Sequence, residues 1–322
     1  MRTLWKFGPS AAVGLSVVLA LSACTTAESS TDAGAAIRLA NCGRTVTLAK
    51  PATSAITVNQ GATESALAIG AAQQLVATAY LDDAISPKWA DAYGRIDVLS
   101  DKYPEREALL EKRPDLVAAS YASAFTDKAL GSEQSLADLG IAAYVSPFGC
   151  ADKSARPAPS WAAVAGETSD YGTLFGRTEQ ADKVNDAMRA TLAELKAKHA
   201  GAGRTIMWWD AKTDSPSVGG RGGGPQLVMD AVGATNVFGQ LSGNWADTSW
   251  EAVLKADPDV IVLIDASWDP AAAKRAYLES DPALRDLSAV KRASYVVVPF
   301  SESTPGARLI DGAVRLSDAL AG

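Results

Sequence analysis

The chain has 322 residues, and its 37 acidic and 30 basic side chains give a formal net charge of −7. An acidic protein without runs of lysine or arginine is a poor partner for nucleic acids, so we expect no nucleic-acid binding. The single histidine is His199, and the three cysteines form no Cys-x-x-Cys pair, which argues against a zinc-type metal site and a His-dependent catalytic site. We therefore expect no catalytic residues, no bound metal and no cofactor.

The N-terminal segment has the composition of an export signal. Arg2 and Lys6 give it a positive start, an apolar run follows, and a Leu-Ser-Ala-Cys sequence ends it at Cys24. This ending resembles a bacterial lipobox, so we expect a signal peptide at 1–23 and lipidation of Cys24, with an ordinary signal peptide as the alternative. The small, polar residues at 24–39 predict a flexible tether, which would anchor the protein by lipid to the extracytoplasmic face of the cell membrane.

The two remaining cysteines are Cys42 and Cys150. In an exported protein, a leftover pair of this kind favours a disulfide. Such a bond would tie the start of the folded region to the end of the first lobe. Two separate buried thiols are the alternative.

The first predicted lobe covers residues 40–159. Short apolar runs alternate there with segments of helical pattern, and this alternation favours an α/β fold with a parallel sheet. The predicted strands are 46–48, 55–58, 75–79, 116–119 and 142–145, and the predicted helices are 63–69, 125–139 and a short one that begins at Glu107.

Residues 160–202 are predicted to form a long helical bridge. Its second half, 179–199, contains neither glycine nor proline and has apolar residues at helical spacing. The second predicted lobe covers 203–322. Its strands are expected at 205–209, 260–264 and 295–299, and its helices from Pro225 to Gly233, from Glu251, at 270–279 and at 305–320. One long helix between two Rossmann-like lobes would leave little room for a flexible hinge.

One eleven-residue pattern occurs in both lobes. It starts at Glu107 and again at Glu251, and each copy is a short helix, a Pro-Asp stop and a buried strand. Proline lacks an N–H group and biases the preceding residue away from helix, which explains the stop. Two lobes of related build are the favoured interpretation, and chance similarity between two helix-to-strand connections is the alternative.

Candidate ligand residues follow from the position of the strands. In open α/β lobes, ligands bind at the carboxyl ends of the strands. Aromatic side chains recur at these ends and would suit a flat or ring-bearing ligand, with basic side chains for its acidic groups. Any single aromatic residue could instead belong to the core of a lobe. The candidates are Asn59, Gln60, Tyr80, Lys102, Tyr121, Arg221, Trp268 and Arg308.

A glycine-rich segment, 219–224, contains Arg221. It lacks the lysine and the spacing of a nucleotide-binding loop. A loose turn is one interpretation. The alternative is a nest of backbone N–H groups that binds an anion ahead of the helix at Pro225.

Taken together, the lipobox, the two α/β lobes, the bridging helix and the repeated motif resemble the binding proteins of ABC importers for iron–siderophores and cobalamin. The resemblance covers residues 46–319. It implies the class III periplasmic-binding-protein fold, a monomer, a small-molecule ligand held between the lobes, and an ABC permease with its ATPase as partner.

In that family, one surface glutamate on each lobe docks into arginines of the permease. The motif match assigns this role to Glu107 and Glu251. The alternative is that both acids simply occupy helix N-termini, where the macrodipole favours them.

A narrower resemblance rests on the Cys-Gly-Arg segment at 42–44, on Ser100–Asp101–Lys102, on 144–147, on 265–268 and on 296–300. These segments are similar to an actinobacterial subgroup whose proposed ligand is a precursor of a deazaflavin coenzyme. The candidate ligands are therefore a ferric siderophore, cobalamin or such a precursor. An exported enzyme and a surface sensor or adhesin on the same two-lobed fold are the alternative functions.

Overall fold

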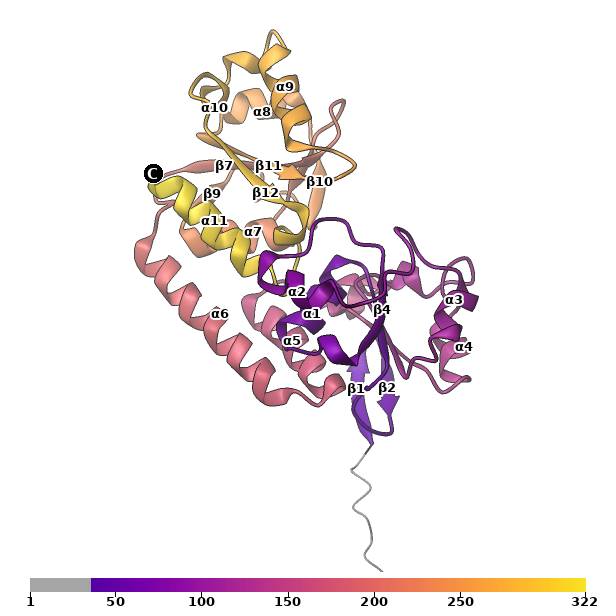
Figure 1. Cartoon of the computed structure of the whole chain (residues 1–322). Coiled ribbons are helices and arrows are strands. Elements are labelled where there is room, and N and C mark those ends of the chain that lie inside the picture. Colours follow the sequence, from indigo (N-terminus) through magenta and orange to yellow (C-terminus); the bar gives the residue numbers. More distant parts are fainter. Residues whose placement is uncertain (1–35) are drawn as a thin grey trace, which may run out of the picture. The chain divides into compact units, whose positions relative to one another are not determined.

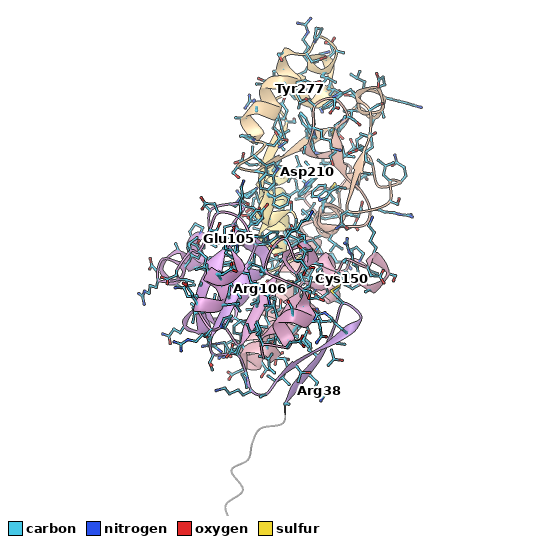
Figure 2. All side chains as sticks on the ribbon, turned by 90° about the vertical axis from the view of Figure 1, so that its right-hand side faces the viewer. Arg38, Glu105, Arg106, Cys150, Asp210 and Tyr277 are labelled. Carbon is cyan, nitrogen blue, oxygen red and sulfur yellow. A yellow bond between two sulfur atoms is a disulfide. The ribbon has the colours of Figure 1, made fainter. Side chains whose placement is uncertain are left out.

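The computed structural model describes residues 36–322 (Figure 1). The signal peptide, Cys24 and most of the expected tether lie outside this range. The first strand, β1 (Ile37–Asn41), occupies positions that the sequence assigned to the tether, so the folded lobe begins at Ile37 rather than at residue 40. Ile37 and Leu39 pack toward the core while Arg38 points away from it (Figure 2), which gives this segment the alternation of a half-buried strand.

The N-terminal lobe contains a parallel four-stranded sheet in the order β4-β3-β5-β6. Both faces of the sheet are covered, because alternate residues of β5 enter two different apolar clusters, Leu116 one and Val117 the other. The strands are β3 (Ala55–Val58), β4 (Leu75–Ala79), β5 (Leu116–Ala119) and β6 (Ala142–Val145), and the helices are α1 (Gln60–Ala68), α2 (Ala90–Tyr93), α3 (Arg106–Glu111) and α4 (Glu133–Ala137).

The helix expected at 125–139 is wrong over most of its length. Only α4 is helical, and it starts after Ser132, whose side chain accepts a hydrogen bond from the backbone N–H of Ser135. Gly131 has a φ of 92°, a left-handed conformation that no helix interior contains. The glycine therefore separates a turn from a short capped helix.

The repeated motif has the same structural role in both lobes. The carboxylate of Asp115 accepts a hydrogen bond of 2.8 Å from the N–H of Thr53, just before β3. The carboxylate of Asp259 accepts one of 3.0 Å from the N–H of Thr205, at the start of the corresponding strand β7. Each Pro-Asp stop thus fixes the beginning of the neighbouring parallel strand.

The bridge between the lobes consists of two helices rather than one. α5 (Trp161–Phe175) ends at Gly176, which has a φ of 64°, and α6 (Thr178–Lys198) packs along it. A side chain at Gly172 would collide with Ala181, so this glycine permits the close packing. α6 contributes to both lobes, because Ala181 belongs to the N-terminal core and Met188 to the C-terminal core.

The C-terminal lobe contains a six-stranded sheet in the order β10-β8-β7-β11-β12, with β9 paired to β7. The expectation of a purely parallel sheet is corrected here, since β8 and β10 pair antiparallel at one edge. The last helix starts at Leu309 rather than at 305. The strands are β7 (Thr205–Ala211), β8 (Ser217–Gly219), β9 (Thr235–Asn236), β10 (Trp245–Asp247), β11 (Val260–Asp265) and β12 (Tyr295–Pro299), and the helices are α7 (Gly224–Val232), α8 (Trp250–Ala256), α9 (Ala271–Ser280), α10 (Ser288–Lys291) and α11 (Leu309–Ala321).

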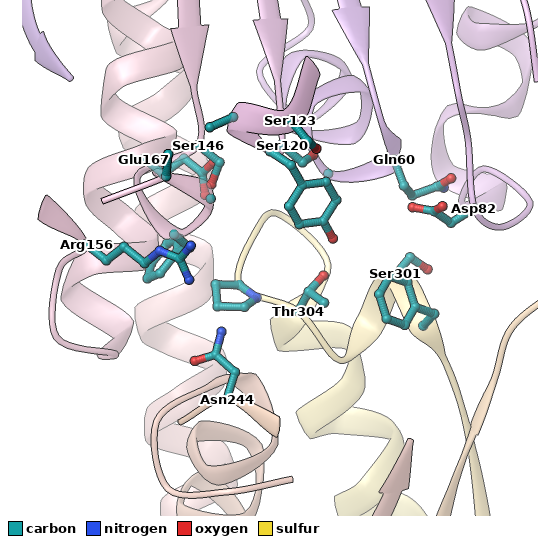
Figure 3. Close-up of a pocket in the computed structure, with 18 of the residues that line it drawn as sticks. Gln60, Asp82, Ser120, Ser123, Ser146, Arg156, Glu167, Asn244, Ser301 and Thr304 are labelled. Atoms are coloured by element: carbon teal, nitrogen blue, oxygen red, sulfur yellow. The ribbon is translucent and has the colours of Figure 1, made fainter. Parts of the chain in front are cut away.

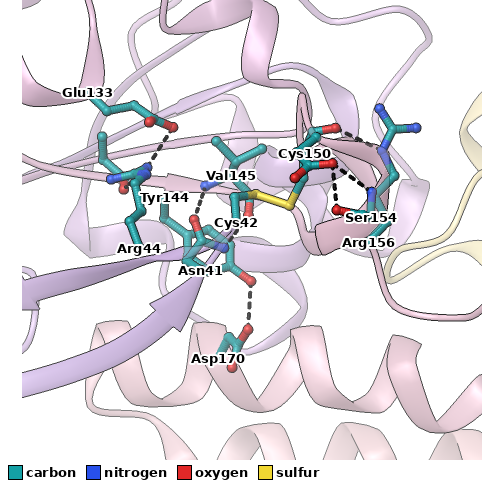
Figure 4. Close-up of a disulfide and its surroundings, with 12 residues drawn as sticks. Asn41, Cys42, Arg44, Glu133, Tyr144, Val145, Cys150, Ser154, Arg156 and Asp170 are labelled. Atoms are coloured by element: carbon teal, nitrogen blue, oxygen red, sulfur yellow. Dashed lines mark hydrogen bonds and ion pairs between the residues drawn. A yellow bond between two sulfur atoms is a disulfide. The ribbon is translucent and has the colours of Figure 1, made fainter.

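A disulfide joins Cys42, in the turn between β1 and β2 (Arg44–Leu48), to Cys150, which follows β6 (Figure 4). The hairpin is held to β6 by polar contacts as well. The side-chain amide of Asn41 donates to the carbonyl of Val145 at 2.7 Å and accepts from its N–H at 3.0 Å. The disulfide and these bonds fasten the hairpin to the last strand of the lobe.

A buried ion cluster connects the two lobes. Arg308 is 7% exposed, and its guanidinium bonds to the carboxylate of Glu302 and lies 3.4 Å from that of Glu64 in α1. Arg315 bonds to the other oxygen of Glu302 at 2.7 Å. Burial raises the pKa of Glu64 to about 7, although the N–H of Ser86 and the charge of Arg308 act in the opposite direction.

We expect removal of the disulfide to destabilise the protein. The double variant C42A/C150A should lower the free energy of unfolding by about 2–4 kcal/mol, because the bond restricts a long loop of the unfolded chain. Urea unfolding with and without reductant measures this loss. In a variant that already lacks both cysteines, reductant should change nothing, and an unchanged unfolding midpoint in C42A/C150A would contradict the expectation.

The ion cluster provides a second prediction. The R308M variant leaves Glu302 and Glu64 buried without this partner, which typically costs about 3–5 kcal/mol. The matched control is K88M, because Lys88 also pairs across the lobes, with Asp311 at 2.7 Å, but its side chain is 61% exposed. Urea unfolding should show a much smaller loss for K88M, as expected of a solvated ion pair. Equal losses in the two variants would refute the special role of the buried cluster.

Candidate ligand-binding site

A cavity of about 560 Å³ lies between the two lobes, at the carboxyl ends of β5 and β6 on one side and of β12 on the other (Figure 3). Both lobes and the bridge contribute to its wall. The lining residues are Gln60, Gly61, Asp82, Ser120, Tyr121, Ala122, Ser123, Thr126, Ser146, Phe148, Gly149, Ala151, Arg156, Glu167, Asn244, Trp245, Phe300, Ser301, Thr304 and Pro305.

The N-terminal wall is held rigid by close backbone contacts. The hydroxyl of Ser120, directly after β5, accepts a hydrogen bond of 3.0 Å from the N–H of Ala62 in α1. A side chain at Gly149 would lie 1.9 Å from the carbonyl oxygen of Ser120, so only glycine fits there. These contacts fix the start of α1 and the segment after β6 against the end of β5.

Aromatic rings make up much of the cavity surface. Tyr121 and Phe148 come from the N-terminal lobe, and Trp245 and Phe300 from the C-terminal lobe. Trp268 does not line the cavity, but its ring packs edge-on against Phe300 with centroids 5.0 Å apart, and it is 56% exposed. Rings on both sides suit a flat or ring-bearing ligand.

The charged residues of the cavity are Arg156, Asp82 and Glu167. Burial raises the pKa of Asp82 to about 6, and the nearby charge of Asp83 adds to the shift. Burial also raises the pKa of Glu167 to about 7, against a hydrogen bond from Ser146 that lowers it, and Asp170 raises it further. Both acids are therefore held toward their neutral forms, whereas an arginine stays charged.

The amino-acid sequence of the chain matches a known protein family. The sequence fits the family described as periplasmic binding protein over residues 52–300, which is more than half of the chain. The chain belongs to the periplasmic binding protein family. The resemblance to this family, drawn from the motifs, is thereby confirmed.

Solved structures of other periplasmic binding proteins share the fold. One from Veillonella parvula has a TM-score of 0.77 and 23% identity, over 88% of this chain and 97% of that one. A protein of an ABC-type Fe³⁺-hydroxamate transport system from Saccharomonospora viridis has a TM-score of 0.74 and 22% identity, over 89% and 99%. A periplasmic haem-binding protein of Vibrio cholerae has a TM-score of 0.68 and 18% identity, over 84% and 99%. No curated protein matches the sequence of this chain.

Of the residues proposed for ligand binding in this periplasmic binding protein, Gln60 and Tyr121 line the cavity. Trp268 reaches it only through Phe300. Asn59 is buried with a φ of 75°, and its N–H bonds to the carbonyl of Ala79 rather than facing the cavity.

The other four candidates lie elsewhere. Tyr80 packs its ring against Tyr103 with centroids 4.9 Å apart, and Lys102 is exposed on a loop. Arg308 is occupied by the acids of the lobe contact, so its assignment to the ligand is not supported. Arg221 is exposed and does not line the cavity.

The glycine-rich segment of the binding protein is neither a loose turn nor an open nest. Its N–H groups at Gly220, Arg221 and Gly222 donate to backbone carbonyls of the segment 241–244 at 2.8–3.0 Å. A side chain at Gly222 would lie 2.8 Å from the backbone of Gly243. The N–H groups of a nest are thus already used, and glycine is required because two backbone segments meet.

Sequence reasoning missed Arg156 and Glu167. Arg156 lies in the connection between β6 and α5, and Glu167 lies within α5, which the sequence marked only as part of a bridge. Asn244 and Trp245 come from a loop and an edge strand of the second lobe. Arg156 follows β6 closely enough to be a candidate from its position in the sequence, whereas nothing in the sequence around Glu167 indicates a binding residue.

Glu107 and Glu251 are exposed in the first turns of α3 and α8, one on each lobe. Hydrogen bonds from its own backbone N–H and from Ser249 lower the pKa of Glu251, which keeps its charge.

Within residues 36–322, no group of three or more histidine, cysteine or acidic side chains is arranged to hold a metal ion.

The pKa of Glu167 predicts a pH dependence of stability. Its folded value of about 7 lies above the ordinary value of 4.5, so the stability that the protonated carboxyl supports is full below about pH 4.5 and is lost as the pH rises through about 7. The melting temperature of E167Q, relative to that of wild type, should therefore rise as the pH increases across this window, because glutamine does not titrate. E194Q, in an exposed part of α6, is the control and should follow wild type. A constant difference between E167Q and wild type would contradict the prediction.

Proposed function

We propose that this chain is the extracytoplasmic receptor of an ABC importer, which captures a solute between its lobes and delivers it to a permease and its ATPase. One observation carries the proposal. This member of the periplasmic binding protein family has a cavity of about 560 Å³ at the carboxyl ends of strands from both lobes, where α/β lobes bind ligands.

The cavity supports a ligand of moderate size with rings. Its volume of about 560 Å³ falls within the range of small-molecule sites, and aromatic side chains from both lobes face it. The candidates are a ferric siderophore, cobalamin or a deazaflavin precursor. The structural relative named for Fe³⁺-hydroxamate transport supports the first class. In a cavity lined as described, a transported metal would arrive inside its own chelate.

The receptor is proposed to be a lipoprotein and a monomer. The Leu-Ser-Ala-Cys ending of the export signal supports lipidation of Cys24, which would tether the protein near the permease. No helix within the described residues is long and apolar enough to cross a membrane.

No catalytic activity is proposed. The single histidine, His199, sits at the C-terminal end of α6 and does not line the cavity. The cavity acids Asp82 and Glu167 come without the paired nucleophile and base that a hydrolase of the Ser-His type needs.

Glu107 and Glu251 are proposed to dock into basic residues of the permease. Their exposed carboxylates stand one on each lobe, so two contacts would let the permease recognise both lobes at once. Opposite charges at such contacts speed association and select the partner.

The docking role is tested by charge reversal. In E107K/E251K, uptake of the compound that native mass spectrometry identifies on the wild-type protein should be lost in cells, because like charges then face the permease. The affinity of the isolated variant for that compound should stay within about twofold of wild type, measured by calorimetry. E194K, an exposed reversal on α6, should leave both quantities unchanged.

Normal uptake by E107K/E251K would overturn the docking assignment. A wild-type protein that binds no compound from its own cells would overturn the receptor function itself.

A further inference from the structure

Arg156 is the only basic side chain among the described residues that line the cavity. Its Nε donates a hydrogen bond of 2.8 Å to the carbonyl of Cys150, and it forms no ion pair with any residue of the described chain. Figure 3 shows the guanidinium directed into the cavity. The two terminal nitrogens of the guanidinium are therefore available to a ligand.

The carbonyl that holds Arg156 belongs to a residue that cannot move freely. Cys150 is completely buried and covalently joined to Cys42, and Figure 4 shows Arg156 beside this bond. A side chain of Arg156 that is fixed at Nε presents its other nitrogens in a planar, preorganised pair, which matches the two oxygens of a carboxylate or phosphate.

Two acids line the same cavity, and neither forms an ion pair with Arg156. Burial holds Glu167 and Asp82 toward their neutral forms, and Figure 3 places Asp82 at the end of the cavity away from Arg156. Glu167 is 4% exposed, lines the same cavity, and its Oε2 has no hydrogen-bond partner within the described chain. A buried carboxyl oxygen without a partner indicates that a bound molecule completes this end of the cavity.

We propose that the cavity recognises a ring-bearing organic acid, whose carboxylate or phosphate binds Arg156 in the orientation set by the Cys42–Cys150 disulfide. This inference rests on the proposed function only in that the cavity binds a solute. The aromatic residues Tyr121, Phe148 and Phe300 contact the rings, and a simple inorganic anion would leave most of the volume of about 560 Å³ unfilled.

The test uses three probes with the same rings. Naphthoate and naphthyl phosphate carry the two anionic groups, and naphthamide is the neutral analogue. Calorimetry and ligand-detected nuclear magnetic resonance on the purified protein should show that at least one anion binds about tenfold or more tighter than naphthamide, because a charge-assisted bidentate bond is stronger than a neutral one. Whichever anion is preferred identifies the class of acid.

Three variants distinguish a specific role of Arg156 from a general effect of positive charge on anion binding. R156Q should abolish the preference for the anions and leave naphthamide binding unchanged. R221Q removes an exposed arginine outside the cavity and should keep the preference. R156K keeps the charge but lacks the planar pair and the Nε bond to Cys150, so it should lose most of the preference.

A further variant tests the role of the disulfide in orienting Arg156. C42S/C150S, shown to be folded by circular dichroism, should lose at least about threefold of the anion preference, since the carbonyl of Cys150 is no longer fixed. If C42S/C150S does not fold, R156K tests the positioning of Arg156 in its place. Full anion preference in R156K, or in folded C42S/C150S, would overturn the claim that the disulfide orients Arg156.

Equal binding of the three probes by wild type, binding of none of them, or a preference that survives R156Q or disappears in R221Q would overturn the inference. These measurements need no permease, so a failed docking test leaves them intact. Loss of the anion preference likewise leaves the uptake result on E107K/E251K unaffected.

Discussion

The cavity depends on the fixed contact between the two lobes. α6 places Ala181 in one core and Met188 in the other, so a large displacement of either lobe would break packing in close-packed interiors. Arg308, which pairs with Glu302 in its own lobe, also approaches the buried carboxyl of Glu64 across this contact, and separating the lobes would remove that partner from Glu64. The ligand site is therefore largely formed before a ligand arrives, which reduces the ordering that binding requires.

The walls of the site obtain their rigidity from backbone contacts rather than from long elements. Gly149 lies against the carbonyl of Ser120, and Gly222 lies against Gly243, each at a distance that a side chain would forbid. Loops usually carry function at the expense of order. Here the N–H groups of Gly149 and of 220–222 donate to neighbouring backbone carbonyls, which holds these loops in defined positions.

The sequence allowed the fold to be predicted further than the site. Strands such as β12 follow from branched apolar runs, and the family follows from the repeated motif, whose aspartates start strands in both lobes. Gln60 and Tyr121, which were proposed for the ligand because they lie just after strands, both line the cavity. Arg308 was assigned to the ligand because nothing local shows that Glu64, 244 positions away, approaches it. Arg156 was missed because a disulfide, not a periodic pattern, determines the path of its segment.

The disulfide encloses the whole sheet of the first lobe and no part of the second lobe. Every strand of the N-terminal sheet, from Ala55 to Val145, lies between Cys42 and Cys150 in the sequence. In a chain that crosses the membrane from its N-terminus onward, both cysteines would reach the oxidising side before β7 and the rest of the second lobe. The first lobe can thus be sealed while the second is still in transit. Closing this bond needs no residue of the second lobe, because both cysteines and all four strands of the N-terminal sheet lie within residues 42–150.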